Sequence, residues 1–199
     1  KEREQPSLNN VDLLKKFFKI TSNQEIKITQ FIDELHNHNR HTNLVGKSTM
    51  LNPWQSHVLD CIQVIKFIKN KEFEILDMGT GAGLPGILLA IMGYRQVSVV
   101  DSNGKKINFI KNICNKLDIK VKILLTRIEK IDNLSYDILI ARALSNLVNL
   151  FSYSHKLSNK ETVLIFLKGK TVIDEINEAK NFWNFNYQTY QSLSDKRGK

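Results

Sequence analysis

The sequence has few cysteines, few prolines and no long apolar stretch. Its 199 residues include two cysteines, Cys61 and Cys114, which lie far apart without a CxxC spacing. This pattern argues against a disulfide framework and against a zinc site. The apolar run at residues 87–92 ends at Gly93, far short of the roughly 20 residues that span a bilayer. Because residues 1–10 are also polar and unlike a secretory segment, we expect a soluble, cytoplasmic protein without membrane contact.

Acidic residues are outnumbered by basic ones. The chain carries 29 Lys and Arg against 20 Asp and Glu, a formal net charge of +9 at pH 7. Such an excess points to a polyanionic partner such as nucleic acid. Lysine, asparagine and isoleucine are all abundant, however, and an AT-rich genome produces that composition without selection for nucleic-acid binding. Charge alone therefore leaves two interpretations open, a nucleic-acid-binding protein and a solvated lysine-rich surface.

The first third of the chain has helical periodicity. Ser22 and Glu25 have the spacing of a capping box, which predicts a helix that starts near residue 22. Asn52 followed by Pro53 predicts another helix start, with helical spacing of apolar residues up to Ile68. The polar residues 36–48 between them are expected to form a loop. We therefore expect residues 1–70 to be a helical extension packed on a core formed by residues 71–199.

From residue 73 onward, short apolar runs alternate with helical segments, the signature of a parallel sheet built from βαβ units. The predicted strands are 73–78, 96–101, 121–125, 136–141 and 162–168, and a sixth is placed at 186–193. The predicted helices are 84–92, 104–117, 146–157 and 171–183. The expected fold is α/β and Rossmann-like, with helices on both faces of the sheet.

A glycine-rich loop follows the first predicted strand. It contains Asp77 just before Gly79, Gly81 and Gly83, and continues through Leu84 to Gly86. In open parallel sheets, ligands bind beyond the carboxyl ends of the strands, and glycines let the backbone approach them closely. A GxGxxG pattern alone also fits NAD enzymes. The acidic Asp77 and the alternating glycines favour S-adenosylmethionine, with the Asp77 carboxylate orienting its ammonium group. No tyrosine is followed by lysine four places later, as a short-chain dehydrogenase requires.

The second predicted strand ends in Asp101. A carboxylate at this position accepts hydrogen bonds from both ribose hydroxyls of either cofactor class. It therefore predicts an adenosine-type ligand without choosing between the two. The alternative role for Asp101 is to cap the helix that begins near Gly104.

The methyl acceptor is constrained by what the chain lacks. Neither cysteine lies in the Pro-Cys context that methylation of cytosine C5 needs, and residues 140–145 lack the proline-aromatic motif typical of exocyclic amines. Guanine N7 presents a free lone pair and needs no general base, so methylation of N7 is consistent with the absence of both motifs. Methylation of a small molecule is an alternative that the chemistry leaves open. Arg142 ends the fourth predicted strand and would lie near the reacting centre, where it could hold guanine O6. The alternative is a surface salt bridge.

Taken together, these motifs resemble the bacterial GidB/RsmG proteins. The resemblance covers most of the chain from about residue 30 and also includes Asn39-Arg40, His57-Val58-Leu59-Asp60, Arg127-Ile128-Glu129, Ala141-Arg142-Ala143 and Leu167-Lys168-Gly169. It implies a class I S-adenosylmethionine-dependent methyltransferase that modifies guanine N7 in the helix 18 loop of 16S rRNA. The implied partner is 16S rRNA or the small ribosomal subunit, and the chain is expected to be a monomer.

The resemblance also implies roles for individual residues. The cofactor would be held by Gly79, Gly81, Gly83, Leu84 and Ser102, by Asp101 at its ribose, and by Ile128 and Glu129 beside its adenine. Arg142 would contact it near the target base and position the reactants. The candidates for RNA contacts are Arg40, Lys105, Arg127 and Lys168. Two departures are Val45, where the family usually has threonine, and the family's closing antiparallel strand, which is expected to be missing because the sequence stops at Lys199.

Other interpretations compete with this one. The chain could be a noncatalytic RNA-binding module with a vestigial cofactor pocket, or an NAD-dependent reductase. His36, His38 and His41 do not share one helical face, so we expect no metal site. The basic segment around Phe17 and Phe18 suggests membrane attachment, but packing of these rings onto the α/β domain is favoured.

Overall fold

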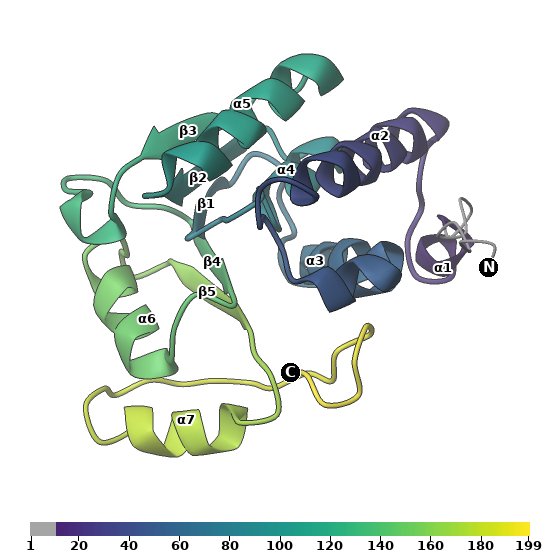
Figure 1. Cartoon of the computed structure of the whole chain (residues 1–199). Helices are drawn as coiled ribbons and strands as arrows, with labels where there is room; N and C mark the ends of the chain where they lie inside the picture. Colours follow the sequence, from purple (N-terminus) through teal and green to yellow (C-terminus); the bar gives the residue numbers. More distant parts are fainter. Residues whose placement is uncertain (1–10) are drawn as a thin grey trace.

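The computed structural model describes residues 11–199, which are built around one parallel β-sheet (Figure 1). The strands follow the order β3-β2-β1-β4-β5, and every neighbouring pair is parallel. The chain runs from β1 outward to β3 and then returns to the other side of β1, so the strand order reverses between β1 and β4. Each strand overlaps a predicted one: β1 (Glu74–Met78), β2 (Gln96–Asp101), β3 (Lys122–Leu125), β4 (Ile138–Arg142) and β5 (Val163–Leu167).

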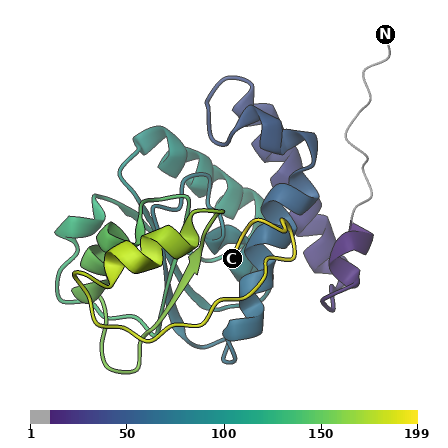
Figure 2. The ribbon, with the colours of Figure 1, turned by 90° about the horizontal axis from the view of Figure 1, so that it is seen from below.

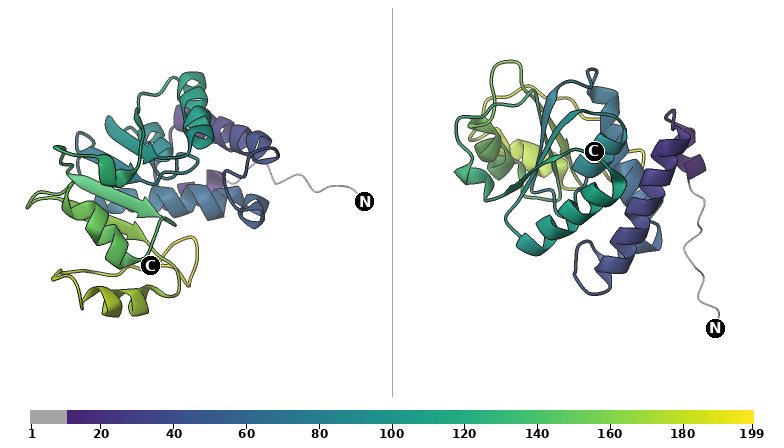
Figure 3. Two further views of the ribbon diagram at one scale, coloured as in Figure 1. Left: turned by 60° about the vertical axis from the view of Figure 1, so that its left-hand side comes forward. Right: turned by 90° about the horizontal axis from the view of Figure 1, so that it is seen from above.

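Helices cover both faces of the sheet (Figures 1 and 3). On one face lie α4 (Gly86–Ile91) and α5 (Gly104–Leu117), and on the other α6 (Leu147–His155) and α7 (Val172–Ala179). Successive strand residues point to opposite faces. Ile75 of β1 accordingly joins the core under α4 and α5, and its neighbour Leu76 joins the core under α6 and α7. This alternation makes the sheet a rigid partition between two hydrophobic cores.

The amino-terminal helices form a layer outside α4 and α5. This layer contains α1 (Val11–Lys15) and α2 (Ser22–Asn39), then η1 (Lys47–Leu51), η2 (Trp54–Leu59), α3 (Asp60–Ile62) and η3 (Gln63–Phe67). Phe31 of α2 is fully buried, and its ring centroid lies 6.4 Å from that of Phe109 in α5. One hydrophobic cluster therefore runs from the helical layer to the sheet.

The start of α2 differs from its prediction by one residue. Thr21, rather than Ser22, is the N-cap: its Oγ1 accepts a hydrogen bond from the Gln24 amide at 3.2 Å, and its own amide donates to Gln24 Oε1 at 2.9 Å. The sequence contains two overlapping capping boxes, one starting at Thr21 and one at Ser22. The box that forms is the one at Thr21, because this residue has the extended backbone that an N-cap requires. The predicted loop also begins too early, because α2 continues to Asn39 and includes His36 and His38.

The basic segment that follows α1 packs on the helical layer. Lys66 of η3 places its Nζ 5.7 Å from the Phe17 ring centroid and 5.6 Å from that of Phe18. Within residues 11–199, no helix is both long enough and apolar enough to cross a bilayer. The described residues also contain no group of three or more His, Cys, Asp or Glu side chains placed to hold a metal ion.

The predicted sixth strand at residues 186–193 is wrong. This segment forms no ladder with the sheet; it runs across the outside of the molecule beyond α7 (Figure 2). Its aromatic residues have different partners: Tyr187 lies against Phe185 of the same irregular segment at 5.8 Å, and Tyr190 lies against Phe67 of η3 at 4.6 Å between ring centroids. An alternating pattern becomes a strand only when a neighbouring strand supplies a ladder of hydrogen bonds. Here the Ser192 amide donates to the Gly198 carbonyl and the Leu193 amide to Gln63 Oε1, and no strand of the sheet pairs with the segment.

Candidate functional site

A cleft of about 700 Å³ opens at the carboxyl ends of the strands. Its walls come from the glycine loop after β1, the turn after β4, the helical layer and the carboxyl-terminal segment. Ligands of open α/β sheets bind where the strand order reverses, and this cleft lies at that place, between β1 and β4. The residues that line it include Leu44, Val45, Ser56, His57, Asp60, Gly79, Thr80, Gly81, Ala82, Leu84, Lys106, Arg142, Lys168, Lys170, Arg197 and Lys199.

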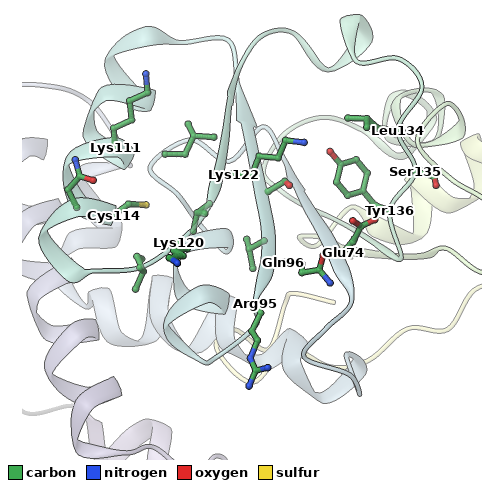
Figure 4. A pocket seen from close by; sticks show the side chains of 16 residues that line it. Glu74, Arg95, Gln96, Lys111, Cys114, Lys120, Lys122, Leu134, Ser135 and Tyr136 are labelled. Atoms are coloured by element: carbon green, nitrogen blue, oxygen red, sulfur yellow. The ribbon is translucent and has the colours of Figure 1, made fainter.

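A second hollow of about 780 Å³ lies at the amino ends of β1, β2 and β3, away from the glycine loop (Figure 4). Its lining includes Glu74, Arg95 and Tyr136, and none of the residues predicted for the site. The amino ends of parallel strands are not where this class of sheet binds its ligands. The smaller cleft at the carboxyl ends is therefore the candidate site.

The glycine loop presents its backbone to the cleft. Gly79, Gly81 and Gly83 all have positive φ, at 63°, 60° and 92°. A side chain on Gly81 would meet nothing of the protein within 4 Å, so the space in front of this residue is open to a ligand. Gly83 instead faces Ile87 of α4 and does not line the cleft. The two glycines thus serve different purposes, ligand access at Gly81 and helix packing at Gly83.

Asp77 lies behind the glycine loop and does not line the cleft. It is fully buried, and its Oδ2 accepts hydrogen bonds from Thr80 Oγ1 at 2.5 Å and from the Gly86 amide at 2.8 Å. Its Oδ1 has no hydrogen-bond partner among the described residues. Burial raises the pKa of Asp77 to about 7. In this arrangement Asp77 ties the start of the loop to α4.

Replacing Asp77 with asparagine is expected to change how stability depends on pH. The folded pKa of about 7 exceeds the ordinary value of 3.8, so the contribution of Asp77 is full below pH 4 and is lost as the pH rises toward 7. Asparagine does not ionise, so the variant does not lose stability as the pH rises through this range. Denaturant unfolding at pH 5 and pH 7.5 should show the variant gaining about 2 kcal/mol relative to wild type, since each pKa unit corresponds to about 1.4 kcal/mol. Asp33→Asn, at an exposed aspartate, controls for charge loss; equal shifts in both variants would contradict the assignment.

Asp101 connects the end of β2 to the glycine loop. Its Oδ2 accepts from the Gly81 amide at 2.9 Å, and its Oδ1 accepts from the Asn103 amide at 2.8 Å. The alternative role as cap of α5 is wrong, because Asn103 is the N-cap and accepts from the amides of Lys105 and Lys106. Asn103 stands two residues nearer to the helix, where an Asx side chain reaches the first amides.

Arg142 extends into the cleft from the end of β4 and is bound by a single turn of the helical layer. Its Nη1 donates to the Ser56 carbonyl at 3.1 Å and to Asp60 Oδ2 at 2.9 Å, and its Nη2 lies 3.0 Å from His57 Nδ1. The side chain is 17% exposed, so the alternative of a surface salt bridge is wrong. Burial, and then the charge of Arg142, lower the pKa of His57 to about 4. His57 is therefore neutral at physiological pH.

Several predicted residues lie outside the cleft lining. Ile128 is buried and Glu129 exposed, both in the short turn η4 (Ile128–Lys130) after β3, and Ser102 is exposed after β2. Arg40, Lys105 and Arg127 are exposed elsewhere on the surface. Their predicted contacts with cofactor or RNA stay predictions.

Lys168 lines the cleft but is bound to protein groups. Its Nζ pairs with Glu175 Oε2 at 2.6 Å and donates to the Ser145 carbonyl at 2.9 Å, which leaves its side chain 12% exposed. A phosphate would have to compete with Glu175 for it. Other basic residues line the cleft without having been predicted from the sequence: Lys106, Lys170, Arg197 and Lys199.

Sequence reasoning also missed residues of the helical layer that shape the cleft. Asn39 Oδ1 accepts from the amides of Leu44 and Val45, at 2.8 and 3.0 Å, and so holds the turn that forms one wall. The resemblance includes these residues but assigns no role to Asn39, nor to His57 and Asp60. Their spacing of three residues, which brings side chains to one side of a helix, was the available signal.

Comparison with known proteins identifies the family. Residues 24–199 match the model of the family described as rRNA small subunit methyltransferase G. This chain belongs to that family. A curated relative named ribosomal RNA small subunit methyltransferase G, from Rickettsia prowazekii (strain Madrid E), is 38% identical over 173 residues, which cover 87% of this chain and 90% of the relative.

Solved structures of other methyltransferases have a fold similar to that of this chain. A ribosomal protein L11 methylase from Lactobacillus delbrueckii subsp. bulgaricus aligns with a TM-score of 0.54 at 18% identity, over 61% of this chain and 64% of that chain. Coclaurine N-methyltransferase bound to N-methylheliamine and SAH aligns with a TM-score of 0.51 at 17% identity, over 81% of this chain and 56% of that chain. Residues 11–199 of this chain therefore have the class I methyltransferase fold.

Proposed function

We propose that this chain transfers a methyl group from S-adenosylmethionine to N7 of a guanosine in the helix 18 loop of 16S rRNA. The observation that carries the proposal is the cleft at the strand-order reversal, which is lined by both the glycine loop and Arg142, with Asp101 holding the Gly81 amide of that loop from behind the lining. The family assignment supports the same substrate class. We further expect the chain to act as a monomer in the cytoplasm, on the small ribosomal subunit or its RNA.

The residues present fit an adenosine-type cofactor. The space in front of Gly81 is free of protein atoms, so the backbone of the loop can approach a ligand closely. Asp101 already orients the Gly81 amide and lies at the end of β2, where a ribose would be held. Bound there, S-adenosylmethionine supplies an electrophilic methyl group on a sulfonium. The tasks left to this chain are to align the acceptor and to exclude water.

The charged groups in the cleft favour an acceptor that needs no general base. Among described residues that line it, Asp60 is paired with Arg142, and Asp195 is paired with Arg197. His57 Nδ1 faces Arg142 and accepts a hydrogen bond from it. These carboxylates and this imidazole are thus occupied by guanidinium partners. Guanine N7 has its lone pair available without deprotonation, whereas an exocyclic amine must lose a proton.

Methyl transfer from labelled cofactor tests this proposal directly. The full chain would be incubated with small ribosomal subunits and with deproteinised 16S RNA, and modified positions mapped by reduction and aniline cleavage at N7-methylguanosine. We expect one labelled guanosine in the helix 18 loop. Label on an adenine, on a cytosine or on protein alone would overturn the N7 assignment. Absence of binding to S-adenosylhomocysteine in calorimetry would overturn the cofactor assignment.

Basic residues at the cleft should make RNA binding depend on salt. Lys170 is exposed and lines the cleft, and each phosphate contact to single-stranded RNA contributes roughly 0.7 to the slope of log K against log salt. Lys170→Ala is therefore expected to reduce this slope by roughly 0.7. Lys160→Ala, at an exposed lysine just before β5, should leave it unchanged. The slopes would be measured by filter binding. Equal slopes for Lys170→Ala and wild type would show that Lys170 makes no phosphate contact with the bound RNA.

A further inference from the structure

The guanidinium of Arg142 is only partly occupied by its protein partners. An arginine has five N–H donors, and Ser56, Asp60 and His57 take three of them. The two that are left have no hydrogen-bond partner among the described residues, and Arg142 lines the cleft. Because three bonds fix the plane of the guanidinium, they also fix the direction in which the other two donors point.

Asp60 is the charged member of this set and is itself held firmly. Its Oδ2 accepts from Arg142, while its Oδ1 accepts from Ser194 Oγ at 2.6 Å and from Gln63 Nε2 at 3.3 Å. With both oxygens engaged, the carboxylate cannot rotate without losing a bond. The side chain is 23% exposed, so its pair with Arg142 is partly screened from water and is stronger than a pair on the open surface.

The local helix geometry gives Asp60 this position. Asp60 begins the short α3 segment, directly after the π-helical η2 and before the 3₁₀-helical η3. Irregular turns of the π type are frequent at functional sites. Here Ser56, His57 and Asp60 converge on one guanidinium that comes from β4, more than 80 residues later in the chain.

We propose that Asp60 is a positioning residue for the methyl-transfer reaction, which acts by holding Arg142 in the orientation that aligns the acceptor. The inference rests on the proposed function and extends it to a residue outside the glycine loop. Without the carboxylate, the long arginine side chain is held by two neutral acceptors only. A displacement of about 1 Å at a reacting centre can cost roughly 100-fold in rate.

A double-mutant cycle separates positioning through Arg142 from any other role of Asp60. Asp60→Asn is expected to lower kcat roughly 10- to 100-fold with little change in KM for RNA. In an Arg142→Met background, the same substitution should change kcat less than about 3-fold. Asp60→Glu should recover part of the rate, and Asp33→Asn controls for loss of charge. Independent, multiplying effects of Asp60→Asn and Arg142→Met would overturn the proposal.

A spectroscopic readout tests the contact without cofactor or RNA. In nitrogen-15 NMR of the full chain, a guanidinium held by three bonds rotates slowly about its Cζ–Nε bond, so its Nη protons give separate signals. We expect these signals for Arg142 in wild type and Asp33→Asn, and their merging in Asp60→Asn or, if that variant does not fold, in Asp60→Ala. Separate signals in every folded Asp60 variant would overturn the positioning role. Inactive wild type with the expected NMR result would instead refute the proposed function alone.

Discussion

Arg142→Met is expected to lower kcat/KM for 16S RNA roughly 100-fold or more. Methionine keeps much of the length and apolar surface of arginine but none of its five donors, so the acceptor loses its hydrogen-bonded alignment. Arg142→Lys should be nearly as inactive, because an ammonium can pair with Asp60 but cannot reproduce the planar fork that also reaches Ser56 and His57. Single-turnover methylation at saturating cofactor measures the effect.

The matched control for this prediction is Arg95→Met. Arg95 is 76% exposed and pairs with Glu72, near the amino ends of the strands and far from the cleft. Its loss should leave methylation within about 2-fold of wild type, because exposed ion pairs contribute little. Circular dichroism would confirm that both variants fold. Activity of Arg142→Met close to that of Arg95→Met would show that Arg142 does not contribute to the reaction.

Phe31→Ala is expected to destabilise the whole protein by about 3–5 kcal/mol. Phe31 is fully buried and packs against Phe109 of α5, so truncation leaves a cavity between the helical layer and the methyltransferase core. For a chain of this size, the loss lowers Tm by on the order of 10 °C. Ile26→Ala on the same helix is the control, since Ile26 is 56% exposed and should change stability by less than about 0.5 kcal/mol.

The same variant tests whether residues 1–70 form a separate unit. Trp54 reports on the helical layer and Trp183 on the opposite face of the sheet, beside Phe151. Replacing one tryptophan at a time by phenylalanine gives two fluorescence probes. Because one hydrophobic cluster joins the layer to the sheet, we expect Phe31→Ala to shift both transitions together. A shift of the Trp54 transition alone would mean that the layer unfolds independently.

The strands and the glycine loop were predictable because their signals are local. A parallel strand is a short run of apolar residues, as in β4, and a positive φ next to a ligand calls for glycine, as at Gly81. The prediction failed where a local pattern depended on a distant partner. Residues 186–193 alternate like a strand, yet no strand of the sheet pairs with them. The start of α2 was misplaced for a local reason: Ser22 also fits a capping box, but Thr21 has the required extended backbone.

The sequence by itself determined the fold class, the place of the cleft and the family motifs, because apolar periodicity and glycine spacing reflect interactions between near neighbours in the chain. Only the tertiary structure decided how the charged groups are paired. It turned Asp77 away from the cleft to support the loop, tied Lys168 to Glu175, and brought Ser56, His57 and Asp60 to Arg142. The contacts of Arg142 join segments more than 80 residues apart in the chain, and even the shorter-range pairings of Asp77 and Lys168 depend on how the loop and helices pack.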